Sequence, residues 1–192
     1  MNNELKFQHV KRLWYLKGGV VYTRWGNKPV AFSGKTKHGY RFQDININGK
    51  RYAVLIHEAT YMLHHDRAID ENKELHHIDG NPENNAVANL IELTRTQHRR
   101  IHNYQVNDPL RGIYIHRGAW CFQWYNDYGC KHNRHFYSID EAMAFRDEIE
   151  RPRRQELRAL GLNCKRVGSG EKSAAIRPSK IYFSRSNAFY RN

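Results

Sequence analysis

The chain has 192 residues, of which 40% are hydrophobic, and a formal net charge of +13 at pH 7. This length suits one or two small domains, and the low apolar content predicts modest cores. No apolar run approaches the roughly 20 residues that span a bilayer, and the polar start lacks the apolar segment of a secretory signal. Three cysteines without a Cys-x-x-Cys pair predict reduced thiols of a cytoplasmic protein rather than a disulfide framework.

The positive charge is concentrated at the two ends of the sequence. Residues 1–50 carry a net charge of +8, residues 51–150 carry −4 and residues 151–192 carry +9. Basic proteins attract polyanions, and no segment joins its basic run to a continuous apolar face suited to a membrane surface. We therefore expect a polyanionic partner, with no membrane and no obligate protein partner. A merely solvated terminus is the alternative interpretation of the basic tail.

The first part of the chain predicts strands followed by a helix. Aromatic, β-branched and glycine residues alternate up to the turn Asn48-Gly49, which is typical of β-hairpins. Apolar residues then recur at helical spacing over residues 54–65. His57, His64 and His65 lie on this helix, where histidines are more often solvated or packed than metal-bound.

The centre of the chain predicts two strands and a helix. Residues 74–77 end the first strand, Asp79-Gly80-Asn81-Pro82 is a turn by composition, and residues 89–93 form the second strand. Thr94 or Thr96 can cap a helix that runs to about Tyr104. From about residue 110 the pattern again predicts strands, followed by a further helix.

The predicted strands of the last part cover residues 112–116, 119–125 and 135–137. Ser138 and Glu141 form a capping box for a helix with Ala142, Phe145 and Ile149 on one face. Pro152 either ends that helix or opens a short basic helix to Gly161, and a flexible arm follows. These patterns divide the chain into units at 1–50, 51–107, 108–150 and 151–192.

Four histidines in the centre suit phosphodiester hydrolysis, which needs an activated water and neutralisation of developing charge. Neighbours on a strand point to opposite faces, so His76 and His77 can have different tasks. One helical turn separates His98 from His102, and with His76 they can form a three-nitrogen metal site that leaves positions open. A zinc-stapled or merely histidine-rich loop without catalysis is the alternative.

Residues 40–104 resemble the HNH or ββα-metal nuclease family, specifically phage-type homing endonucleases. The resemblance rests on His76-His77-Ile78-Asp79-Gly80-Asn81-Pro82-x-Asn84-Asn85, Asn89-Leu90 and His98. It implies that His77 is the general base, that Asn89 braces the strands and orients that base, and that His76 and His98 bind metal. It further implies site-directed cleavage of double-stranded DNA by an intracellular protein of a phage-infected bacterial host.

The sequence departs from the homing pattern at its metal positions. Homing members often carry Asp or Asn where His76 and His98 stand, whereas bacterial toxin nucleases use histidine and share His102. Imidazole ligands favour zinc and other ions of borderline hardness over magnesium. We expect a divalent cofactor, Mg²⁺ or Mn²⁺ in function, with Zn²⁺ also able to bind. Arginines on the same helix either steady the phosphate or are solvated, and they are Arg95, Arg99 and Arg100.

Residues 109–150 resemble the APETALA2-type DNA-binding domain, in which a three-stranded sheet lies in the major groove. The resemblance rests on Arg111-Gly112-Ile113-Tyr114, Trp120, Gln123, Tyr125, Arg134 and the helix 140–145. It implies DNA contacts from Arg111, Tyr114, His116, Arg117, Trp120, Gln123, Tyr125 and Arg134. The alternative is a sheet whose aromatic residues serve only core packing.

The sequence therefore predicts an α+β protein. A ββα-metal core is preceded by β-hairpins and followed by a small three-stranded antiparallel sheet packed on one helix, then by a basic C-terminal arm. The predicted function is a metal-dependent HNH DNA endonuclease that nicks or cuts both strands. The contrasting hypothesis is a non-catalytic DNA-binding regulator with a structural metal site.

Overall fold

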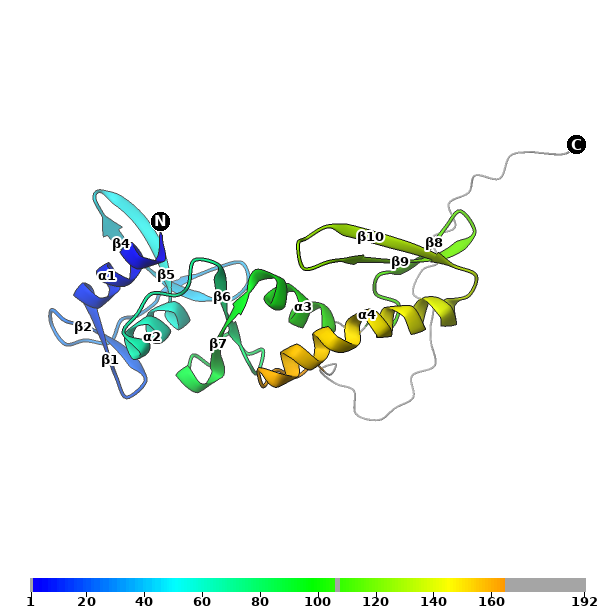
Figure 1. The fold of residues 1–192 in the computed structure, drawn as a ribbon. Coiled ribbons are helices and arrows are strands. Elements are labelled where there is room, and N and C mark those ends of the chain that lie inside the picture. Colours follow the sequence, from blue (N-terminus) through cyan, green and yellow to red (C-terminus); the bar gives the residue numbers. More distant parts are fainter. Residues whose placement is uncertain (1, 106–107, 165–192) are drawn as a thin grey trace, which may run out of the picture.

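The computed structural model describes residues 2–105 and 108–164, and the predicted C-terminal arm from residue 165 lies outside them. The described ranges form a mixed α+β fold with four α-helices and several small antiparallel sheets. Figure 1 shows an N-terminal lobe, a central unit and a distal sheet in a row, with one long helix running from the sheet back to the centre. Within these ranges no helix has the length and apolar character needed to cross a membrane.

The N-terminal lobe is a helix-capped set of hairpins. It contains α1 (Asn3–Leu13), β1 (Trp14–Lys17), β2 (Val20–Thr23), β3 (Gly34–Lys35), β4 (Arg41–Ile47), β5 (Lys50–Leu55) and α2 (Ile56–His65). The predicted hairpin at Asn48-Gly49 is confirmed, because both residues have positive φ, 51° and 79°, as a type I′ turn requires. Helix α1 was not predicted. The Oδ1 atom of Asn2 caps it by accepting from Leu5 N at 2.8 Å.

The N-terminal lobe and the central unit share one hydrophobic core. Its buried members are Phe7, Val10, Trp14, Val21, Phe32, Ile45, Ile47, Val54, Ala59, Tyr61, Met62, Ile69 and Leu90. They come from α1 and the hairpins, from α2, and from the strand that begins at Leu90. The predicted boundary between residues 50 and 51 therefore does not separate two cores.

The central unit is a two-stranded antiparallel sheet followed by a helix. It consists of β6 (Lys73–His77), the 3-10 helix η1 (Val87–Asn89), β7 (Leu90–Thr94) and α3 (Arg95–Gln105). His76 pairs with Ile91 and His77 with Leu90. The predicted cap at Thr94 is confirmed, since Thr94 Oγ1 accepts from Gln97 N at 3.2 Å and Gln97 Oε1 accepts from Thr94 N at 2.9 Å.

The distal unit is a sheet of order β10-β9-β8 with one helix on it. Its elements are β8 (Ile113–His116), β9 (Ala119–Tyr125), β10 (Lys131–Phe136) and α4 (Ile139–Ala159). Ser138 caps α4 as predicted, because its Oγ accepts from Glu141 N at 3.2 Å. The predicted helix end or restart at Pro152 is wrong, and α4 continues through it. Proline costs a helix one N–H bond, and the packing of Leu157, beyond it, against the central unit offsets that loss.

The shared core predicts that α1 stabilises the whole front half of the molecule. Val10 is fully buried in that core, so Val10→Ala should lower the free energy of unfolding by roughly 1–3 kcal/mol. The measurement is chemical denaturation followed by tryptophan fluorescence. Leu5→Ala on the same helix is the control, because Leu5 is exposed and should change little. An unaltered Val10→Ala curve would show that α1 folds apart from this core.

Candidate metal centre and active site

Three histidines from two elements converge on one point. His76 comes from β6, and His98 and His102 come from consecutive turns of α3. One nitrogen from each ring lies within 4.8 Å of the others, and the Nε2 atoms of His98 and His102 are 3.1 Å apart. Two nitrogens bound to a tetrahedral zinc would be roughly 3.3 Å apart at its usual bond lengths. The structure thus brings together all three predicted metal ligands.

The His76 ring supports this interpretation independently. Its Nε2 atom is buried and has no hydrogen-bond partner among residues 2–105 and 108–164, a costly state for a polar atom unless something else binds it. Burial, followed by the neighbouring His98 and His102, lowers the pKa of His76 to about 4. Burial and His98 also lower the pKa of His102. Both rings are therefore neutral at pH 7, which is the form that binds a metal ion.

A carboxylate that sequence reasoning missed holds one of these rings. Glu74 Oε2 lies 2.7 Å from His98 Nδ1. The carboxylate fixes a proton on Nδ1 and leaves Nε2 directed at the cluster, as is common for metal-bound histidines. Glu74 stands two positions before His76 on β6 and so shares its face. That alternation is the sequence signal that would have found it.

His77 occupies the opposite face of β6, as predicted, away from the metal cluster. Its ring stacks on Tyr40 at 5.9 Å between centroids and meets His57 edge-on at 4.9 Å. Its Nε2 atom is 3.2 Å from Asn85 Oδ1. Because Asn85 gives its amide N–H to Glu83 O, its Oδ1 accepts from His77 Nε2–H. This assignment leaves the lone pair of His77 on Nδ1.

Asn89 braces the loop between the two strands. Its Oδ1 accepts from Asp79 N at 3.0 Å, and its Nδ2 donates to Asp79 Oδ1 at 2.9 Å and to Asn84 O at 2.8 Å. Hydrogen bonds from Asn81, Asn84 and Asn89 lower the pKa of Asp79, which makes this carboxylate the centre of the loop. The predicted bracing role thus fits these contacts, whereas the residue bonded to His77 is Asn85.

The distal sheet divides the predicted DNA-contacting residues between its two faces. Side chains at alternate positions, Tyr114, His116, Gln123 and Tyr125, lie on the face away from α4. Trp120 packs against the core beneath α4, and the Arg134 guanidinium lies 4.6 Å from the centre of the Phe145 ring. The prediction that Trp120 and Arg134 share the reading face is therefore corrected by the strand register. Arg111 and Arg117 are exposed in the turns before and after β8.

The three arginines of α3 differ in their surroundings. Arg95 has 76% of its side chain exposed, and the Arg99 guanidinium lies over the Tyr125 ring at 5.5 Å. The Arg100 side chain is only 11% exposed and pairs with Asp127 and Glu156. Arg95 also lies 3.7 Å from Glu74 Oε1, but its side chain is exposed, as is Arg99. The predicted phosphate contact is therefore better suited to Arg95 and Arg99, because Arg100 is mostly buried between two carboxylates.

Two cavities adjoin helix α3, which carries His98 and His102. One, of about 430 Å³, is lined by Tyr40 and His57 together with Glu74 and His98. The other, of about 380 Å³, lies between α3 and the distal sheet, with Arg99 and Tyr125 in its wall. Open space therefore adjoins His98, and a second cavity on α3 begins at the next residue, Arg99, and extends to the sheet.

The chain is similar to known nucleases in two comparisons. Residues 54–100 match the family described as HNH endonuclease. Among solved structures, the chain is similar to the one titled "DNA binding and cleavage by the HNH homing endonuclease I-HmuI". The identity is 17%, the coverage 79% of each chain and the TM-score 0.38. No curated protein matches the sequence.

The buried His57 predicts a specific loss of stability in acid. Burial, then His77 and Lys6, lowers its pKa from 6.5 to about 3, so the unfolded chain takes up this proton before the folded protein does. Stability from this group is complete above pH 6.5 and falls as the pH drops toward 3, by roughly 1.4 kcal/mol per pH unit. Denaturation of the metal-free protein at about pH 7 and about pH 5 measures this slope.

The variant His57→Phe keeps a ring but cannot bind a proton, so its stability should fall less between those two pH values. His64→Phe, at an exposed position on the same helix, should behave as the original protein does. Equal acid sensitivity in the His57→Phe variant and the original would contradict the assignment.

The Glu74–His98 contact predicts a change in metal affinity. Glu74→Gln removes the charge that fixes the His98 proton, so Zn²⁺ or Mn²⁺ binding measured by calorimetry should weaken by roughly 10–100-fold. Glu83→Gln, an exposed change in the loop after β6, is the control and should bind as before. An unchanged metal affinity in Glu74→Gln would show that Glu74 does not contribute to the metal centre.

Proposed function

We propose that this chain is a metal-dependent DNA endonuclease of the HNH homing type, which hydrolyses phosphodiester bonds in double-stranded DNA by nicking or by cutting both strands. One observation carries the proposal. Three histidine nitrogens meet on one face of β6, while a fourth histidine is held on the other. Of these four residues, His76, His77 and His98 lie within the segment that matches HNH endonucleases, and His102 follows two residues after its end. The candidate metal ligand His76 and the candidate base His77 are therefore neighbours on β6.

His76, His98 and His102 would hold the divalent ion. A bound ion would act as a Lewis acid and stabilise negative charge on the phosphate and on the leaving 3′ oxygen. The cluster has a buried, unpartnered nitrogen from His76 and a carboxylate-oriented ring from His98. We propose Mg²⁺ or Mn²⁺ as the working ion, with Zn²⁺ also able to bind this nitrogen-rich set.

His77 would act as the general base. Asn85 accepts its Nε2–H and so limits rotation of the ring, which presents the Nδ1 lone pair to a water molecule. A neutral imidazole within reach of the attacking water can accept its proton. Asn89 keeps the loop that carries Asn85 in place through its bonds to Asp79 and Asn84.

The distal sheet would bind the DNA on its open face in the manner of an APETALA2-type domain. Tyr114, His116 and Gln123 lie on that face, and Tyr125 continues it to Arg99 on α3. Arg99 follows directly after the metal ligand His98. A DNA strand that contacts Tyr125 and Arg99 is therefore led toward the metal centre.

The contrasting hypothesis is a DNA-binding regulator with a structural metal. Structural zinc sites almost always have four protein ligands, whereas catalytic sites have three and an open position. Among the described residues the cluster contributes three histidines, and His102 is exposed. This donor set favours catalysis.

The experiment that tests the proposal is incubation of supercoiled plasmid with the protein and Mg²⁺, Mn²⁺ or chelator. Nicking or cutting should need the metal ion, and His77→Ala should lower turnover by roughly 10²–10⁴-fold while metal and DNA binding persist. Loss of metal content in His77→Ala would assign this histidine to the metal instead. Absence of metal-dependent cleavage by the original protein would support the regulator.

A further inference from the structure

Helix α4 belongs to two hydrophobic cores at once. Its first half supplies Ala142, Phe145 and Ile149 to the core beneath the distal sheet. Its second half supplies Leu157, which is fully buried, to a separate core. That second core contains Leu93, Ile101, Tyr104, Leu162 and Cys164. The chain therefore leaves the central unit after α3, forms the sheet and returns along α4 to pack on the unit it left (Figure 1).

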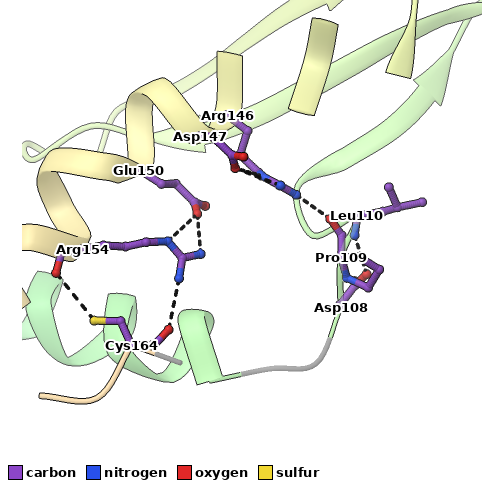
Figure 2. A network of polar contacts seen from close by, with 8 residues as sticks. All are labelled: Asp108, Pro109, Leu110, Arg146, Asp147, Glu150, Arg154 and Cys164. Atoms are coloured by element: carbon purple, nitrogen blue, oxygen red, sulfur yellow. Dashed lines mark hydrogen bonds and ion pairs between the residues drawn. The ribbon is translucent and has the colours of Figure 1, made fainter. Parts of the chain in front are cut away.

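Polar contacts hold the C-terminal half of α4 against the central unit. The Arg154 guanidinium lies 4.0 Å from the centre of the Tyr104 ring, and it donates to Glu150 at 2.7 Å and to Cys164 O at 3.2 Å. Figure 2 shows the Arg154 side chain reaching from α4 to Cys164, in the segment that follows the helix. On the sheet side, Arg146 donates to Pro109 O in the connection that leads out of α3. The connection from α3 to the sheet is thus tied to α4, the helix that leads back to the central unit.

Arg100 connects α3 to the β9–β10 turn and to α4. It lies on α3 between the ligands His98 and His102, and it pairs with Asp127 in the β9–β10 turn and with Glu156 on α4. Gln97 Nε2 adds a contact to Glu156 at 2.7 Å. The helix that carries two metal ligands is therefore fixed directly to the sheet and to α4.

We propose that α4 holds the sheet and the metal centre at one separation, so that cleavage occurs at a constant offset from the bases that the sheet contacts. This inference rests on the proposed endonuclease function. With 21 residues, α4 is about 32 Å long, which equals about nine base-pair steps of DNA. Domains joined by mobile linkers would spread their cuts over several phosphates, because the reactive group would reach each of them. Arg154 and Leu157 are the specificity-determining residues of this arrangement.

The test compares cleavage positions. The probe is fragmented DNA of the genome that encodes this chain, incubated with Mn²⁺, and cut ends are mapped to single nucleotides. The original protein should cut at one dominant phosphate per site. The double variant Arg154→Ala/Leu157→Ala should lower the ratio of dominant to neighbouring cuts roughly tenfold or more, because small misplacements of reacting groups change rates strongly. Its nicking of supercoiled plasmid should persist, because neither residue contacts the metal centre.

Matched variants separate this effect from misfolding. Arg158→Ala/Leu160→Ala changes two exposed residues on the same turns and should keep the dominant cut. Inserting Gly-Ser-Gly-Ser between Arg151 and Pro152 keeps every side chain of both cores but interrupts the helix, and it should also broaden the cuts.

Three outcomes would overturn the inference. The first is an insertion variant with unchanged cut positions, and the second is an original protein that cuts with no dominant phosphate. Both of these leave the endonuclease function standing. The third, absence of metal-dependent nicking of plasmid by the original protein, would remove the proposed function as well.

Discussion

The alternation of side chains along β6 is the constraint on which the rest of the site depends. His76 and His77 are adjacent, and a strand must send them to opposite faces. One face meets α3 and receives His98 and His102, and the other meets α2 and Tyr40. A shift of one residue in the pairing with β7 would exchange the two histidines. The loop that fixes this register is therefore as important as the ligands themselves.

That loop achieves its precision with hydrogen bonds rather than with a hydrophobic core. Asp79 is fully exposed, yet two asparagine side chains and a backbone N–H converge on its carboxylate. Asn89 links this turn to the start of β7, and Asn85 then reaches His77. The asparagine-rich segment is thus a scaffold of short side chains that is centred on the Asp79 carboxylate, and the contact to the candidate base itself comes from the uncharged Asn85.

Local patterns could be read from the sequence, and long-range contacts could not. The Asn48-Gly49 hairpin and the caps at Thr94 and Ser138 each depend on neighbouring residues, and the structure confirms them. Helix α1 was missed because its buried face, which includes Phe7, packs on elements distant in sequence. The helix break at Pro152 was wrong for the same reason, since tertiary contacts override a weak local preference. The pairing of Glu74 with His98 and of Asn85 with His77 required the fold.

Arg100 shows how one residue type serves two purposes on one helix. Arg95, which pairs with Glu74, and Arg99, which lies over Tyr125, have exposed side chains, while Arg100 turns inward to Asp127 and Glu156. A planar guanidinium with five donors can bridge two carboxylates from different elements, whereas a lysine ammonium is a point charge on a flexible stem. The central unit therefore uses part of its basic charge to position the sheet. Under the proposed function, attraction of DNA would be left to the exposed arginines and to the basic flanks.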